Sequence, residues 1–147
     1  MKKFLKIIGI LIILAVVIVA VMLFVVGNAA KLTEYKLGGD KVASVNAVIG
    51  EVRKTTGVSS GTSNGVRHKQ YTYETTSMVE DLKAYSGYLQ NNGWLVTQGY
   101  DLNAGTGEAQ YGKESVDKGK ILILSIAFAP DKYTIRINKL TGELTTK

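Results

Sequence analysis

The most regular hydrophobic pattern in the chain is a run of twenty residues without a charged or strongly polar side chain, Ile7–Val26. The run consists of Ile, Leu, Val and Phe except at Gly9, Ala15, Ala20 and Met22. Twenty helical residues span about 30 Å, which is the thickness of a bilayer's hydrocarbon core. In lipid, a lone segment satisfies its backbone N–H and C=O groups only as a helix. The pattern therefore predicts a transmembrane helix, with residues 1–27 forming a short tail and the anchor.

The charges that flank this run predict its orientation. Lys2, Lys3 and Lys6 precede it, so the tail should stay in the cytoplasm and the rest of the chain should lie outside. The alternative is a signal peptide cleaved after the last residue of Gly27-Asn28-Ala29, which would release a secreted domain. Signal peptides have apolar cores of about 7–15 residues. The longer run found here favours an uncleaved anchor.

The remainder is long enough for one domain, residues 38–147, after a juxtamembrane spacer of residues 28–37. At the start of this domain apolar residues recur at three- and four-residue spacing, which predicts a short helix within residues 41–49. Asp40 is the expected N-cap and Gly50 the expected stop. The same valine-rich segment also fits an alternating strand, so helix and strand both stay open.

Two strands are predicted next, Glu51–Val58 and Val66–Thr75, and they should pair as a hairpin. The segment between them, Ser59–Gly65, has no apolar residue, which predicts a mobile, exposed tip loop. In the second strand Tyr71 and Tyr73 share one face, and polar residues occupy the other.

The clearest helix of the domain follows. Ser77 and Glu80 have the spacing of a capping box, and Asp81 adds negative charge to the first turn. Asn91-Asn92-Gly93 should end the helix, because glycine adopts the left-handed cap conformation readily. The apolar residues of this helix form one stripe: Met78, Leu82, Tyr85 and Leu89.

After this helix the hydrophobic period changes to two, which predicts an antiparallel meander of four strands. The predicted strands are Trp94–Asp101, Ala109–Ser115, Lys120–Ala129 and Tyr133–Lys139. The third strand is apolar on one face and partly apolar on the other. We therefore expect the main helix to cover one face of the sheet and the short helix to cover part of the other. The predicted class is α+β: an N-terminal transmembrane helix, then one small domain whose antiparallel sheet, a hairpin plus a four-strand meander, packs on one main helix.

Charge and composition narrow the range of partners. The chain has 18 basic and 12 acidic residues, which gives a net charge of +6. Three of the basic residues precede the anchor, so the remainder has 15 against 12 and a net charge of +3. There is no basic stripe and no binding motif, so no nucleic-acid partner is predicted. The absence of cysteine excludes a disulfide, a thiol nucleophile and a lipid-modified cysteine.

Candidate catalytic residues are few. His68 is the only histidine, and no Gly-x-Ser-x-Gly motif accompanies it. Glu74, Glu80 and Asp81 are close in sequence and could form an acid–base pair, although a helix N-terminus also favours acidic residues. Asp101–Glu108 matches a calcium loop only loosely, because small residues interrupt the ligand spacing. No residue is therefore assigned to catalysis, to a cofactor or to a metal.

The eight tyrosines and the single tryptophan could form a surface for sugars or peptides. Tyr85 belongs to the helix stripe, and Tyr71, Tyr73 and Tyr133 occupy positions where sheet packing is expected. Tyr88 and Tyr100 are the aromatic residues best placed for exposure.

The stretch Glu80–Trp94 has the pattern Tyr85-x-x-Tyr88-Leu89-x-x-x-Gly93-Trp94 and leads from a helix into strands. It resembles a helix-to-strand stretch in small membrane-anchored or lipoprotein-like proteins of Gram-positive bacteria. The resemblance covers about the last half of the chain. It brings no known activity, so no functional residue is carried over.

Two hypotheses for the function follow. The preferred one is a non-catalytic domain, held outside the membrane by Ile7–Val26, that presents a sheet face or the tip loop to a protein or a cell-wall component. The alternative is a small cell-envelope hydrolase that uses carboxylates. An exposed aromatic patch would favour binding, and a cleft with two carboxylates of raised pKa would favour hydrolysis. The sequence predicts no oligomeric state.

Overall fold

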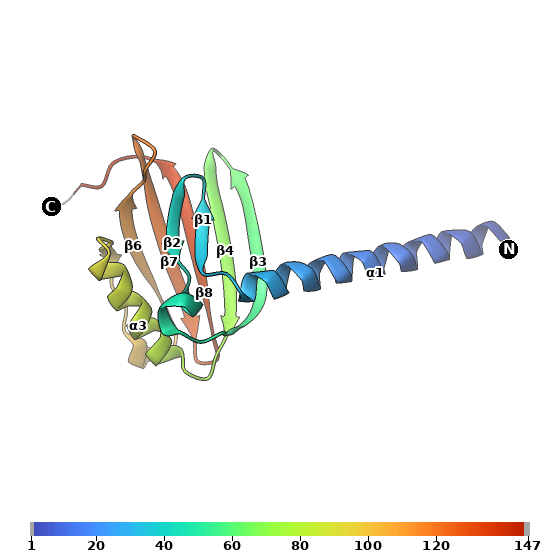
Figure 1. Ribbon diagram of the computed structural model, residues 1–147, viewed down its shortest axis with the longest axis horizontal. Helices are drawn as coiled ribbons and strands as arrows, with labels where there is room; N and C mark the ends of the chain where they lie inside the picture. The colour runs from blue at the N-terminus through green and yellow to red at the C-terminus, as the bar shows by residue number, and fades with distance from the viewer. Residues whose placement is uncertain (1, 146–147) are drawn as a thin grey trace.

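An N-terminal helix projects from an α+β domain (Figure 1). The computed structural model describes residues 2–145, and for residues 2–9 and 30 it describes the backbone alone. The helix, α1 (Lys2–Ala30), contains the apolar run, and its segment Ile10–Ala29 has a mean hydropathy of 3.5. By length and composition α1 could span a membrane.

The domain is built on a six-stranded antiparallel sheet with the strand order β3-β4-β8-β7-β6-β5. Its strands are β3 (Lys54–Ser63), β4 (Val66–Glu74), β5 (Leu95–Gln98), β6 (Gly107–Glu114), β7 (Lys120–Ala129) and β8 (Lys132–Thr141). The predicted hairpin, β3–β4, and the predicted meander, β5–β8, are both confirmed. Pairing of β4 with β8 joins them into one continuous sheet.

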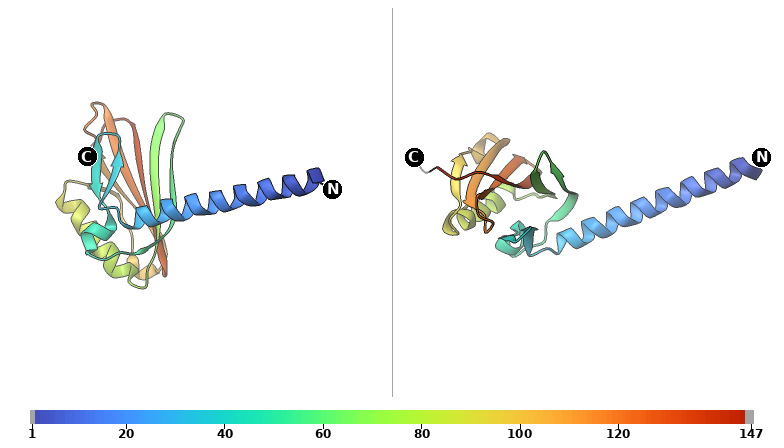
Figure 2. Two further views of the ribbon diagram at one scale, coloured as in Figure 1. Left: turned by 45° about the vertical axis from the view of Figure 1, so that its right-hand side comes forward. Right: turned by 90° about the horizontal axis from the view of Figure 1, so that it is seen from above.

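In residues 2–145, the helices and strands that cover this sheet all lie on one face of it (Figure 2). They are the main helix α3 (Met78–Asn91), the short helix α2 (Val45–Ile49), and a separate hairpin of β1 (Glu34–Leu37) and β2 (Asp40–Ala43). Tyr35 of β1 stacks on Tyr71 of β4 with ring centroids 4.5 Å apart. The short helix contacts α3. The expectation that it covers the opposite face of the sheet is therefore wrong.

The alternation along β7 shows the two different faces. Leu122, Leu124 and Ile126 are buried beneath the covering layer. On the other face Ile123 is only half-buried and Ala127 is exposed. One face of the sheet thus forms the core, while the other is largely open.

The apolar stripe predicted for α3 is confirmed, because all four of its residues are buried. The predicted end is also confirmed, since Gly93 follows the helix with a left-handed φ of 79°. The predicted capping box is wrong, because the Ser77 side chain makes no cap hydrogen bond. Instead, the Ser77 backbone N–H donates to the Thr75 hydroxyl at 2.9 Å. A short side-chain turn therefore leads the chain into α3.

The segment before α2 is a strand, so the predicted helix is shorter than residues 41–49. Ser44 is the N-cap of α2. The predicted N-cap, Asp40, is wrong, because its carboxylate accepts a hydrogen bond from Lys139 instead. Gly50 ends the helix as predicted, with a left-handed φ of 73°.

The segment predicted as a tip loop, Ser59–Gly65, is exposed as predicted, but most of it is strand. β3 continues to Ser63, and the turn to β4 contains only Asn64 and Gly65. Both turn residues have positive φ values, 50° and 77°, as a type I′ hairpin turn requires. The serine-rich segment is therefore part of an edge strand.

The strand predicted for Trp94–Asp101 is shorter, because β5 covers only four residues. Trp94 lies before β5 and is buried in the core. A short 3₁₀ turn, η1 (Leu102–Ala104), then leads into β6.

Two alanine variants separate packing from capping in α3. Leu82 is 0% exposed, so Leu82→Ala should lower the free energy of unfolding by about 2–5 kcal/mol. Ser77→Ala removes no cap hydrogen bond and should change it by less than about 0.5 kcal/mol. Chemical denaturation of both variants checks this. A loss of about 1 kcal/mol for Ser77→Ala would indicate a working N-cap and would contradict the observed start of α3.

Candidate functional site

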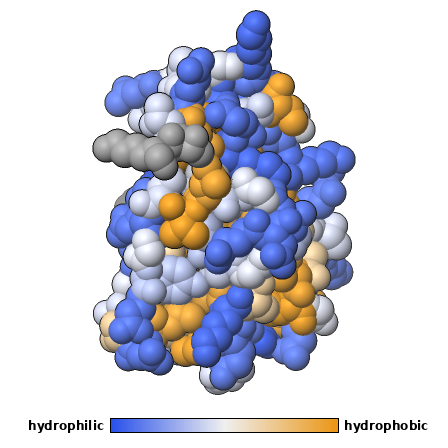
Figure 3. Space-filling view, turned by 90° about the vertical axis from the view of Figure 1, so that its left-hand side faces the viewer, coloured by the Kyte–Doolittle hydropathy of each residue, from blue (hydrophilic) through white to orange (hydrophobic). Residues whose placement is uncertain are grey.

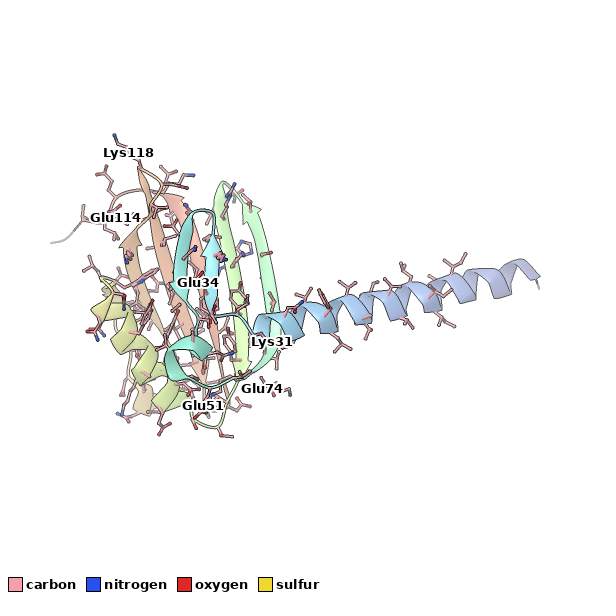
Figure 4. All side chains as sticks on the ribbon, in the orientation of Figure 1. Lys31, Glu34, Glu51, Glu74, Glu114 and Lys118 are labelled. Atoms are coloured by element: carbon pink, nitrogen blue, oxygen red, sulfur yellow. The ribbon has the colours of Figure 1, made fainter. Side chains whose placement is uncertain are left out.

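A buried ion pair joins the start of α3 to the segment that enters β3. Arg53 Nε and Nη2 donate to the two carboxylate oxygens of Asp81, each at 2.8 Å. The Asp81 side chain is 3% exposed and the Arg53 side chain 19%. Glu51, which is labelled at this end of the domain in Figure 4, is a second and exposed partner of Arg53 at 2.6 Å. A two-point contact of this kind fixes the geometry of both side chains.

Two hydroxyl groups also donate to Asp81, those of Thr75 at 2.9 Å and Tyr133 at 3.2 Å. Burial raises the pKa of Asp81, but the hydrogen bonds and the charge of Arg53, together with these hydroxyls, outweigh it and hold the pKa below its usual value. Burial and the neighbouring Asp81 raise the pKa of Tyr133. Asp81 therefore stays ionised and lacks the raised pKa of a catalytic acid.

The three acidic residues considered for catalysis do not converge on one site. Glu80 and Asp81 line a groove of about 440 Å³ that α2 and α3 border. Glu74 lines a second groove of about 430 Å³ and forms an exposed ion pair with Lys54 at 2.6 Å. Arg53 lines both grooves. Glu51 lines the groove with Glu80 and Asp81, but Arg53 pairs with both Glu51 and Asp81, so these two carboxylates are engaged in ion pairs.

A second buried ion pair joins β2 to β8. Lys139, whose side chain is 2% exposed, pairs with Asp40 at 2.6 Å and with Asp117 at 2.5 Å. Asp40 also accepts from the Ser115 hydroxyl at 2.7 Å and from the Val116 N–H at 2.9 Å. Burial lowers the pKa of Lys139, but the two carboxylates outweigh it, so the pKa is raised. This cluster is fully paired and holds the β1–β2 hairpin on the sheet.

The open face of the sheet carries a continuous line of polar side chains. Cross-strand pairing places one of them on each of the six strands. This line, called here the polar row, consists of Ser59, Gln70, Arg136, Ser125, Gln110 and Gln98. All six are half-buried or exposed. With about 4.8 Å between neighbouring strands, the row is about 24 Å long.

His68 lies beside the polar row on the same face, paired with Asn138 of β8 and Gly61 of β3. With Arg136 and Ser63 it lines a shallow groove of about 370 Å³. The described lining of this groove contains no aspartate or glutamate to orient the imidazole. The parts of a serine triad are therefore not brought together there.

The C-terminal segment crosses the β6 end of the open face. The Leu144 N–H donates to the Glu114 carboxylate at 3.0 Å. The Leu144 side chain packs over Gly112, where a Cβ atom would lie only 2.8 Å from it. Seen from the side of α3 and this segment, the surface is mostly hydrophilic and its hydrophobic residues form separate patches (Figure 3). This side therefore shows no large apolar interface.

The aromatic residues of the domain lie in its core or pack against it. Tyr88 stacks on Tyr85 with ring centroids 6.1 Å apart. Tyr100 packs edge-on against Phe128, and its hydroxyl is hydrogen-bonded to Ser86. Both candidates for exposure, Tyr88 and Tyr100, are half-buried, so that expectation is wrong. Within residues 31–145 no aromatic side chain is exposed, and no aromatic binding patch forms.

The stretch Asp101–Glu108 forms a turn. The Asp101 carboxylate caps η1 by accepting from the Asn103 N–H at 2.9 Å, and Gly105 ends it with a left-handed φ of 74°. In the described part of the chain, no three histidine, aspartate or glutamate side chains gather as possible metal ligands.

Comparison with known proteins gives no assignment, because no protein-family model, no curated protein and no solved structure matches the chain.

The ion pair of Asp81 makes stability depend on pH. The pKa of Asp81 is lower in the folded state than the value of about 3.9 in an unfolded chain. Ionised Asp81 therefore contributes its full share to the free energy of unfolding above about pH 5. This contribution is lost as the pH falls through about 3.9 toward the folded pKa. Asp81→Asn should lower the free energy of unfolding by about 3 kcal/mol near pH 7, because it leaves Arg53 without its buried partner.

Urea unfolding of both proteins between about pH 3 and pH 7 measures this contribution. The variant should lose less stability on acidification than the wild type. Two parallel curves would contradict the role of Asp81 as a buried, paired carboxylate.

Proposed function

We propose that this chain is a single-pass membrane protein whose domain lies outside the membrane and binds a protein or another envelope component without catalysis. The observation that carries the proposal is the open sheet face with its polar row, on a domain attached to a helix long enough to span a bilayer. The partner would contact hydrogen-bonding side chains on this face.

The exposed apolar side chains of α1 support its proposed role as a membrane anchor. From Ile10 to Phe24 its large apolar side chains are exposed, Phe24 by 71%, so in water they would have no apolar partner. Lipid would supply one. Ala29, the residue before the alternative cleavage site, is only 4% exposed and belongs to the core. A protease would need this junction to open, which favours the uncleaved form.

The composition of the open face supports a binding role. One face of an antiparallel sheet often faces water, and such a face is ordinarily rich in charged residues. In the polar row only Arg136 is charged. Other charged residues of this face, Glu74, Lys132 and Glu108, lie toward the strand ends. Depletion of charged residues is typical of the central part of an interface. The hydroxyls of Thr72 and Thr134, hydrogen-bonded at 3.0 Å, extend this uncharged region beside the row.

The hydrolase alternative is the weaker one, although Glu51, Glu80 and Asp81 line one groove. Asp81 is held ionised by Arg53, and Glu74 faces a different groove from Glu80. The binding hypothesis needs none of these residues, because Glu80 and Asp81 lie on α3, and Glu74 lies at the end of β4, outside the polar row.

Site-specific photocrosslinking in living cells tests the binding surface. A photoreactive residue replaces Gln70 or Arg136 on the polar row. As controls, it replaces Gln90, a matched glutamine, or Lys83, a matched cation, on the exposed side of α3. All four positions are accessible without removal of a core side chain. We expect crosslinked products from the two row positions and none from the two helix positions.

The full-length chain is then purified in mild detergent and its products are separated by mass. Equal yields from the row and from α3 would mean that the open face has no specific partner. Crosslinked products from the helix positions alone would show that the partner binds the covering layer, which would contradict the proposal.

A further inference from the structure

The end of α1 is packed on the domain. The helix continues to Ala30 and contacts β3, and Ala29 is part of the core. The backbone N–H groups of Lys31 and Leu32 donate to carbonyls of the last turn, each at 3.2 Å. In Figures 1 and 2 the helix leaves the domain past the β3 edge of the sheet. The position of β3 relative to the anchor is therefore fixed by packing.

A groove of about 230 Å³ opens at this junction. Its apolar lining comes from three elements and one connecting residue: Phe24, Val25 and Ala29 of α1, Val58 of β3, Tyr71 of β4, and Leu32. Asn28 is the one amide side chain in the described lining. No aspartate, glutamate, lysine or arginine lines it among the residues that the structure describes. The chemistry of the groove thus fits a hydrocarbon chain better than a polar ligand.

The groove opens at the level where the apolar run Ile7–Val26 ends. At 1.5 Å per residue, Phe24 and Val25 lie within about 3 Å of the end of this run along the helix axis. If the run fills the hydrocarbon core, these residues mark its outer boundary. Val58 lines the same groove, so the middle of β3 lies at this boundary too.

We propose that this groove binds an acyl chain of a phospholipid in the outer leaflet, so that the β3 edge of the domain rests on the membrane. The groove is continuous with the lipid-facing surface of α1, because Phe24 and Val25 belong to both. Lys31, which is exposed and follows α1 directly (Figure 4), lies where the phosphate group of that lipid would be. The inference rests on the membrane anchor of the proposed function and is independent of the partner on the open face.

Single cysteines can test this inference cleanly, because the chain has no cysteine of its own. Three matched valine variants are used: Val17→Cys in the middle of α1, Val58→Cys in the groove, and Val116→Cys at the exposed β6–β7 turn. Each full-length variant carries a bimane label and is reconstituted in phosphatidylglycerol–phosphatidylcholine nanodiscs. Some of the lipids carry a spin-label quencher, either near the top of the acyl chain or in its middle.

The label at Val58 should lose most of its emission to the shallow quencher, and the label at Val17 to the deep one. The label at Val116 should keep its emission with both. Leu32→Cys, on another wall of the groove, repeats the measurement if a label at Val58 disturbs the fold, which circular dichroism of the labelled protein would reveal.

Three results would overturn the inference. Quenching at Val17 without quenching at Val58 and Leu32 would leave the anchor intact and reject the lipid in the groove. No quenching at Val17 would reject the anchor itself. Disulfide-linked dimers of the unlabelled Val58→Cys protein, with no lipid quenching of the labelled one, would assign the groove to a second copy of the chain.

Discussion

Five tyrosine side chains are fully buried on the covered side of the sheet, and each brings a hydroxyl that needs a hydrogen-bond partner. They are Tyr35, Tyr73, Tyr85, Tyr111 and Tyr133. The Tyr35 and Tyr73 hydroxyls bind each other at 2.7 Å, and the Tyr85 hydroxyl donates to the Ala43 carbonyl at 3.1 Å. A buried hydroxyl left without a partner would cost about 1–3 kcal/mol. The three tyrosines on the sheet strands, Tyr73, Tyr111 and Tyr133, find partners on β1 and α3, so these two elements are held to that face. Tyr35 and Tyr85 link α2 and β2 to them.

Because the covering elements supply these hydrogen-bond partners on one face of the sheet, the opposite face stays largely uncovered. The ion pair of Arg53 with Asp81 and that of Lys139 with Asp40 reinforce the arrangement by tying α3 and the β1–β2 hairpin to the core. Both pairs hold structural elements together, and Asp81 and Lys139 stay charged within them. What remains available is the polar row, on a sheet whose β3 edge lies next to α1. The binding proposal and the lipid groove therefore concern different sides of the same sheet.

Local periodicity predicted the local structure well. The apolar run, the stripe of α3 and the strands of the hairpin and meander all depend on neighbours within a few residues. The sequence could not predict the pairing of β4 with β8, nor which face the covering layer takes, because both depend on contacts between distant segments. Two signals were present and missed. Asn64-Gly65 is typical of a tight hairpin turn, and Lys139 stands at an inward position of β8, two residues after Ile137, which predicts a buried partner.

The central claim is that a partner outside the membrane covers the open face. The reactivity of a thiol on this face, compared between intact cells and purified protein, tests it most directly. Arg136→Cys on the polar row and Lys83→Cys on α3 each place one thiol at an exposed position. A membrane-impermeant maleimide is added to intact cells and to the purified protein in detergent. The account predicts that both thiols react in intact cells, that Arg136→Cys reacts several-fold more slowly there than in the purified protein, and that Lys83→Cys reacts at one rate. Equal rates for Arg136→Cys, or no reaction of either thiol in intact cells, would contradict it.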